Sequence, residues 1–230
     1  LGDVYKRQVL VYLGLFVIIA WTAGVKKRWF LLALVLGVAA VIIVWPHVPG
    51  YIQGRFTVVI DHITGNPDTY VEQTQGRGWQ QTRSILAIGS GGLFGQGYLQ
   101  GTQTQSASEE ALPARHTDEI FAVCGEEFGM AGCILVILLL TAIILRCVWV
   151  ARRANSPMAA YVAMGYAAML LLQTVINIGM CLYVFPVVGL TLPFFSSGGS
   201  SIITLYACMG IVSGIKMRSL PSWLRDRSQL

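Results

Sequence analysis

The chain has 230 residues, of which 55% are hydrophobic and only 12% are charged, and its formal net charge is +5. Soluble domains carry roughly a quarter charged residues, so this composition, with a mean hydropathy of +0.64, excludes an ordinary soluble domain and predicts an all-α polytopic membrane protein. A nucleic-acid binder would need basic residues on a soluble face with polar or aromatic residues between them, and the sequence has no such stretch.

The first residues, LGDVYKRQ, start at Leu1 rather than Met and run straight into an apolar stretch without the cleavage site of a signal peptide. We expect residues 1–8 to be a non-native or artefactual leader on a fragment of a longer protein. They carry no functional argument.

Five apolar segments reach or approach the roughly 20 residues that a membrane-spanning helix needs. We expect them at about 9–25, 29–45, 119–147, 158–185 and 200–217. Only the basic triplet 26–28 separates the first two, which predicts a transmembrane hairpin over 9–45. Three more transmembrane helices are expected within 119–218, followed by a cytoplasmic tail over 219–230.

Basic residues gather beside these segments, as the positive-inside rule predicts for cytoplasmic loops. The clusters are Lys26, Lys27 and Arg28; Arg146, Arg152 and Arg153; and Lys216, Arg218, Arg225 and Arg227. Alternation of sides then places residues 46–118 in a long extracytoplasmic loop, and loops of this length usually carry function. Within it, YIQGRFTVVIDHI (51–63) predicts a short amphipathic helix on the membrane surface.

The stretch LPARHTDEIF places several charges where the third segment begins. An acid at the mouth of a membrane helix is usually functional or paired. The structural alternative is that Thr117 or Asp118 caps the helix and Glu119 favours its positive end. A cap leaves Arg115 and His116 unexplained, whereas the whole group supplies a possible base, a fixed cation and a titratable donor.

Glu126 and Glu127 follow in the same segment, and helical spacing places Glu119 and Glu126 on one face. Acids that face a cavity could bind cations, relay protons or order an arginine. Pairing with Arg83 or Arg115 is the structural alternative.

Two glycine-rich stretches interrupt the apolar pattern. GSGG (89–92) resembles an anion-binding nest, although close helix packing explains its glycines equally well. FPVVGLTLPFFSSGGSS (185–201) breaks the helix at membrane depth, where irregular backbone must be buried or line a cavity. Asn177, a lone polar residue in the fourth segment, is expected to be an interhelical hydrogen-bond residue.

Four stretches in this order resemble signatures of the SEDS family (shape, elongation, division and sporulation proteins), the bacterial peptidoglycan glycosyltransferases. They are SILAIGSGGLFGQGYLQGTQTQ, LPARHTDEIFAVCGEEFG, INIGMCLYVFPVVGLTLPFFSSGGSS and GIVSGIKMR. The resemblance covers about residues 75–218 and implies about five transmembrane helices of a ten-helix fold, with a long extracytoplasmic loop.

GTQTQ and LPARHTD look closer to the rod-shape branch (RodA), although GLTLPF also occurs in division (FtsW) and sporulation (SpoVE) members. Three residues depart from the family pattern. Ala114 stands where the family usually has Glu, Glu119 where it usually has Phe, and Ser197 where Tyr is common.

The resemblance implies that lipid II, an undecaprenyl-pyrophosphate disaccharide-pentapeptide, is polymerised at the outer face of the bacterial plasma membrane, with Asp118 as the general base. Arg83 and Arg115 are candidates to stabilise the leaving pyrophosphate. A divalent cation (Mg²⁺ or Mn²⁺) could share that role, and no metal ligands are assigned. The expected substrate-binding residues are Arg83, Ser90, Gly91, Gly92, Arg115, His116, Thr117, Glu126, Glu127, Ser196, Gly198, Gly199 and Ser200.

Membrane lipid and a class B penicillin-binding protein, which supplies the transpeptidase, are the implied partners. Three other functions stay open. A division- or sporulation-type polymerase would run the same chemistry. A lipid-precursor flippase or other transporter would also use broken helices and intramembrane acids. A non-catalytic membrane scaffold would tolerate Asp118→Ala.

Overall fold

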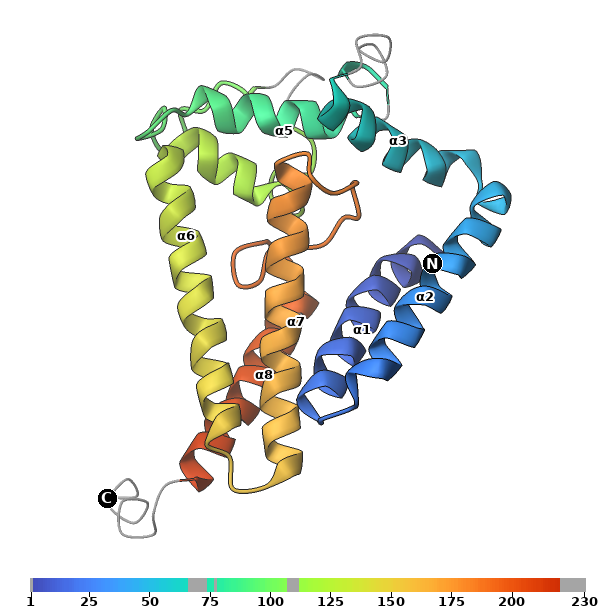
Figure 1. The fold of residues 1–230 in the computed structure, drawn as a ribbon. Helices are drawn as coiled ribbons and strands as arrows, with labels where there is room; N and C mark the ends of the chain where they lie inside the picture. The colour runs from blue at the N-terminus through green and yellow to red at the C-terminus, as the bar shows by residue number, and fades with distance from the viewer. Residues whose placement is uncertain (1, 66–73, 77, 107–111, 220–230) are drawn as a thin grey trace, which may run out of the picture. The chain divides into compact units, whose positions relative to one another are not determined.

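A computed structural model describes residues 2–65, 74–76, 78–106 and 112–219, and these form helices joined by turns and loops, without a strand (Figure 1). The chain divides into two compact units. The first contains residues 1–25, 137–174 and 193–230, and the second contains residues 26–136 and 175–192. The expected tail falls outside the described residues beyond Ser219.

Within the residues that the structure describes, four helices are long and apolar enough to cross a membrane, which confirms the membrane class. They cover Lys27–His47 (α2, Lys27–Val44, with the short helix η1, Trp45–His47), Ile120–Arg152 (α6), Pro157–Cys181 (α7) and Gly199–Arg218 (α8). The first expected segment is also helical, as α1 (Gly2–Thr22), although only its Val11–Thr22 part is apolar throughout.

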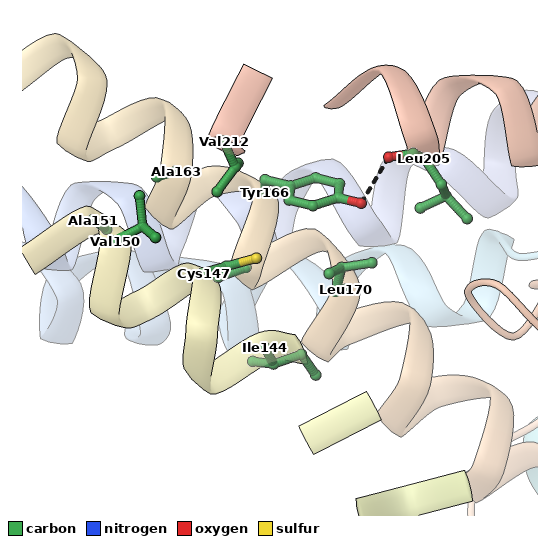
Figure 2. Packing of buried hydrophobic residues seen from close by; sticks show 10 residues of the cluster. Ile144, Cys147, Val150, Ala151, Ala163, Tyr166, Leu170, Leu205 and Val212 are labelled. Atoms are coloured by element: carbon green, nitrogen blue, oxygen red, sulfur yellow. Dashed lines mark hydrogen bonds between the residues drawn. The ribbon is translucent and has the colours of Figure 1, made fainter. Parts of the chain in front are cut away.

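The first unit has its core where α6, α7 and α8 meet, and Figure 2 shows the buried side chains that form it. The buried side chains recur every three or four residues on α6 and α7 and seven residues apart on α8, which is the spacing of one helix face. The buried set is Ile144, Cys147, Val150, Ala151, Ala163, Tyr166, Ala167, Leu170, Leu205 and Val212. Within it, the Tyr166 hydroxyl donates to the main-chain oxygen of Leu205 at 2.8 Å, which satisfies the ring's polar end and fixes α7 against α8.

α7 begins where its sequence predicts and ends earlier than expected. Pro157 occupies the first helical position, and the Ser156 hydroxyl accepts the Ala159 amide at 3.2 Å, which is an N-cap. The helix ends at Cys181 rather than near 185. Tyr183 takes a left-handed backbone conformation (φ 61°), and the amides of residues 184 and 185 both turn back to the Gly179 carbonyl.

The expected extracytoplasmic loop over 46–118 lies in the second unit and contains two helices, α3 and α5. The expected surface helix is present as α3 (Gly50–Thr64), closed by Gly65 in the left-handed conformation (φ 67°). Its place on a membrane surface stays a prediction. A further helix, α5 (Trp79–Ser90), was not expected, because its polar first half interrupts the apolar pattern.

α6 changes direction at Gly129, whose φ of 67° and ψ of −164° are not helical (Figure 1). The main chain around this break pairs with the glycine-rich segment that follows α5. The amides of Met130 and Ala131 donate to the carbonyls of residues 92 and 93 (2.9 and 3.1 Å), and the amides of residues 96 and 97 donate to those of Glu126 and Glu127 (2.9 and 3.1 Å). The backbone groups that the break removes from the helix are therefore satisfied by a neighbouring segment.

Candidate active site around Asp118

Asp118 lies two residues before α6, in a run of turns over residues 113–119, and its side chain is half-buried. Its main-chain oxygen accepts a hydrogen bond of 2.7 Å from the side-chain amide of Asn177, near the end of α7. The same amide nitrogen donates its second hydrogen to the Leu190 carbonyl at 2.6 Å. Through these two bonds, the fully buried Asn177 joins the backbone at Asp118 to the loop after α7.

The residues just before Asp118 were expected to form a site with it, and they occupy the same turns. Arg115 donates its guanidinium Nη1 to the Thr104 carbonyl, and its Nε lies 3.4 Å from Nε2 of His116. The Thr117 hydroxyl donates to the Ala114 carbonyl at 3.2 Å. Ala114 has a φ of 48°, which is uncommon for any residue other than glycine, and it is exposed.

Glu119 is fully buried, although it stands where a Phe is common in the family that the sequence resembles. Gln80, near the start of α5, donates to its Oε1 at 3.0 Å. Burial raises the pKa of the Glu119 carboxyl, opposed by the polar groups of Ser84, Cys181 and Gln80, and the neighbouring Asp118 raises it further. The Glu119 carboxyl therefore favours its neutral form more than an ordinary glutamate does.

Glu126 and Glu127 are both buried and both bind the segment 101–105. Glu126 accepts the amides of Gln103 (2.6 Å) and Thr104 (2.9 Å) and the Thr102 hydroxyl (3.1 Å). Glu127 accepts the Thr104 hydroxyl (3.3 Å) and the side-chain amide of residue 105 (2.9 Å). Glu119 and Glu126 were expected on one helix face. Glu119 instead precedes α6 and binds Gln80 of α5, whereas Glu126 lies within α6.

These bonds form a chain of contacts that leads to Arg115. Two carboxylates hold the GTQTQ segment by its amides and hydroxyls, and the Thr104 carbonyl of that segment receives the Arg115 guanidinium. A carboxylate that accepts backbone amides makes strong, charge-assisted hydrogen bonds. The geometry therefore gives Glu126 and Glu127 a role in positioning, and their expected contact with substrate stays a prediction.

The anion-binding nest that was one of two interpretations of GSGG stays a prediction, and Gly91 (φ −76°, ψ −18°) and Gly92 (φ 56°) directly follow α5. α5 continues to Ser90, so the amides of Gly89 and Ser90 lie in its last turn, the end of a helix that presents carbonyl oxygens. The Ser90 hydroxyl donates to the Ala87 carbonyl at 2.8 Å. A Cβ atom on Gly91 would lie 2.0 Å from the Gly125 carbonyl oxygen, so close packing explains this glycine. Gly92 is exposed, with a φ of 56°.

α5 also fixes the loop after α7, a function that the sequence did not reveal. The buried Gln81 side chain donates to the carbonyls of Met180 (3.2 Å) and Phe185 (2.7 Å), and the Ser84 hydroxyl donates to that of Cys181 (3.0 Å). The sequence feature that could have indicated this role is the spacing of three residues between Gln81 and Ser84, which places both on the buried face of α5 with Ala87. Arg83, next to Ser84, is half-buried in the same helix.

The broken segment 182–198 contributes to both units. In the second unit, the Val187 carbonyl accepts a bond of 3.0 Å from Arg55 of α3, and the Tyr183 ring stacks on His62 with centroids 4.0 Å apart. In the first unit, Ser196 is buried. Gly198 precedes α8, and Gly199 and Ser200 begin it. The contribution of the last four residues to a site with Asp118 stays a prediction.

No group of three or more His, Cys, Asp or Glu side chains is placed to hold a metal ion anywhere in the described ranges.

Comparison with known proteins adds to this geometry. A family model described as cell cycle protein, FtsW/RodA/SpoVE, matches residues 5–220. Peptidoglycan glycosyltransferase MrdB of Escherichia coli K12 is 39% identical over 210 residues, which is 90% of this chain and 53% of that protein. A probable peptidoglycan glycosyltransferase FtsW of Coxiella burnetii is 44% identical over 140 residues, 60% of this chain and 37% of that protein. The chain thus spans about half the length, or less, of these curated relatives.

A solved structure supports the fold. A chain from a study of how a peptidoglycan synthase complex coordinates polymerization and crosslinking matches with a TM-score of 0.70 and 27% identity. The match covers 93% of this chain and 56% of that one.

Proposed function

Because the chain belongs to the FtsW/RodA/SpoVE family, we propose that the protein containing it is a peptidoglycan glycosyltransferase that polymerises lipid II into glycan strands. The names of relatives at 39% and 44% identity support this activity. The four spans support a multi-pass membrane protein, as a substrate anchored in lipid requires. We place it in the bacterial plasma membrane with Asp118 at the extracytoplasmic face.

In the proposed reaction, Asp118 is the general base. Its carboxylate takes the proton of the acceptor sugar's 4-hydroxyl as that oxygen attacks the anomeric carbon of the growing strand. A carbon–oxygen bond forms there, the bond from the same carbon to the pyrophosphate breaks, and the lipid pyrophosphate leaves with the electron pair. The anomeric configuration inverts in this single displacement, unlike the two steps of retaining glycosidases.

Positive groups should stabilise the pyrophosphate as negative charge develops on it. Arg115 is supported by its place three residues before Asp118 and by its fixation on the Thr104 carbonyl. Arg83 is supported by its half-buried position in α5 beside the residues that hold the loop after α7. A divalent cation bound to the pyrophosphate could share this charge, and rates in chelator against Mg²⁺ or Mn²⁺ would measure its contribution.

The observation that carries the proposal is the Asn177–Asp118 bond. It fixes the backbone of a half-buried acid at the mouth of α6 from a second membrane helix. A base has to be held within hydrogen-bond reach of its proton, and a backbone fixed by a buried amide gives that positioning.

We assign the protein to the rod-shape branch and expect a transpeptidase partner. The MrdB match extends over 90% of the chain, whereas the FtsW match covers 60%. The structural match comes from a complex that couples polymerization to crosslinking, which supports a class B penicillin-binding protein as partner. Complementation of Escherichia coli depleted of MrdB tests the branch, because rescue of rod shape supports it and rescue only of division in FtsW-depleted cells contradicts it.

The decisive experiment measures lipid II polymerisation by the complete gene product, wild type against Asp118→Asn, with the partner's transpeptidase blocked. We expect a loss of about 10²–10⁴-fold, the usual contribution of a general base. Asp61→Asn on α3 is the matched control. Full-strength chains from Asp118→Asn would remove it from the chemistry. Lost movement of lipid II across the bilayer, with polymerisation retained, would favour a transporter.

A further inference from the structure

The C-terminal part of α6 presents a tryptophan between two arginines on one face. Arg146, Trp149 and Arg153 are spaced three and four residues apart, which places them one above the other on a helix. Trp149 is half-buried and packs against the buried core of the first unit (neighbouring residues in Figure 2), so its ring is held in place. Arg153 directly follows α6.

A third cation reaches the same ring from α8. The guanidinium carbons of Arg146 and Arg153 lie 4.3 and 4.4 Å from the Trp149 ring centroid, and the Lys216 ammonium lies 4.3 Å from it. We call these four residues the Trp149 cluster. Each cation is attracted to the ring's electron-rich faces. Because all three cations lie within 4.4 Å of one ring centroid, the distance between any two of them is at most about one Debye length at physiological salt. The three positive charges therefore repel one another.

The described helices that carry the cluster supply no Asp or Glu after residue 128 to relieve this repulsion. No Asp or Glu occurs between residues 129 and 219, which includes α7, α8 and most of α6. The turn after α6 adds positive charge with Arg152. That turn is fixed to the end of α8, because the Asn155 side chain donates to the Arg218 carbonyl at 3.0 Å. The cations are therefore gathered in a defined arrangement that lacks an anion from these helices.

Exposed apolar side chains next to the cluster indicate which kind of anion would bind these cations. Leu145 and Met217, the chain neighbours of Arg146 and Lys216, are 62% and 42% exposed, and Ile211 on α8 is 55% exposed. A soluble phosphate would gain nothing from these side chains. A phospholipid would place its phosphate among the cations and its acyl chains along the exposed helix surfaces.

We propose that the Trp149 cluster binds the phosphate group of an anionic phospholipid. The cluster shares no residue with the site around Asp118, and the proposal does not depend on the function proposed above.

Trp149 provides its own reporter for the test. The complete gene product is placed in phosphatidylcholine vesicles that contain phosphatidylglycerol, with bromine on the acyl chains of one lipid or the other. The Trp149 signal is the difference in fluorescence between the wild type and Trp149→Phe. We expect brominated phosphatidylglycerol to quench it more than brominated phosphatidylcholine at equal content. Each cation removed, as in Lys216→Gln or Arg153→Gln, should lower the preference about fivefold.

The matched control is Lys26→Gln with Arg28→Gln, which removes basic residues at the start of α2. Because neither belongs to the cluster, the preference should stay unchanged. Equal quenching by both brominated lipids in the wild type would overturn the proposal. Loss of the preference when inorganic phosphate is added would assign the site to a free phosphate instead of a lipid. If the control variant also lost the preference for phosphatidylglycerol, the preference would depend on net charge alone, and this result would likewise overturn the proposal.

Discussion

Asn177 and Asp118 are joined through a side chain and a backbone, not through two side chains, across 2.7 Å. Substitution of Asp118 therefore leaves the bond in place, whereas substitution of Asn177 removes it and leaves the Asp118 side chain chemically intact. The two substitutions separate chemistry from positioning.

Asn177→Leu should lower the polymerisation rate and the stability together. Two carbonyls lose their donor in a buried site, which costs about 1–3 kcal/mol each. Thr174→Val is the control, because the Thr174 hydroxyl donates only to Leu170 of its own helix (2.7 Å). Rates and thermal unfolding in detergent measure both effects. An unchanged rate for Asn177→Leu would show that the bond does not position Asp118.

Glu119→Gln should flatten the pH dependence of stability. Burial raises the pKa of this carboxyl in the fold above its ordinary value of 4.5. Stability from this group is therefore complete below about pH 4.5 and is lost as the pH rises through the raised pKa. Gln can still accept from Gln80 and cannot ionise, so the variant should be the more stable protein at alkaline pH. Thermal unfolding across a pH series measures this, with Asp61→Asn as the control. Parallel curves for Glu119→Gln and the wild type would contradict the prediction.

Glu126→Gln should loosen the GTQTQ segment. The amides of Gln103 and Thr104 lose a shared carboxyl acceptor, and a typical intramolecular hydrogen bond contributes about 0.5–1.5 kcal/mol. Hydrogen exchange of these two amides should accelerate, and polymerisation should fall because Arg115 is held by the same segment. Glu127→Gln is the comparison, since its partners are side chains and both amides stay bonded. Equal exchange in both variants would contradict the assignment.

Gly91→Ala and Gly89→Ala form a matched pair only two residues apart. The added methyl group would lie 2.0 Å from the Gly125 carbonyl oxygen at position 91 and would meet nothing within 4 Å at position 89. We expect Gly91→Ala to destabilise by at least about 1–3 kcal/mol through overpacking. Gly89→Ala should be neutral or stabilise the helix by up to about 1 kcal/mol. Unfolding temperatures decide, and equal effects would show that α5 does not pack as described.

The sequence predicted the spanning helices well because each is a long apolar run with a capping or basic residue at its end, as in Ser156-Pro157 and Lys216 to Arg218. It missed α5, whose polar Gln81 and Ser84 are buried through hydrogen bonds to main-chain carbonyls of distant residues. Polar residues of this kind resemble a solvated loop until their partners are known.

The site could be predicted in part for the same reason. The charges of the HTD stretch are local in sequence and were recognised. The roles of Glu126 and Asn177 depend on acceptors or donors 22 to 59 residues away, and no local pattern encodes such pairings. The glycines of GSGG were open to two interpretations because the same residue type serves an anion nest and close helix packing.

The break at Gly129 bears on how the protein enters a membrane. Both acids of α6 precede it, and the part from residue 130 to 152 contains no acid. That part is about 23 residues, or about 35 Å, which is enough to cross a hydrocarbon core of about 30 Å. The insertion machinery therefore receives an apolar segment whose arginines lie toward its end, and the two carboxylates can be buried later by the GTQTQ segment. The sequence of α6 thus allows this helix to be inserted before its two acids are buried.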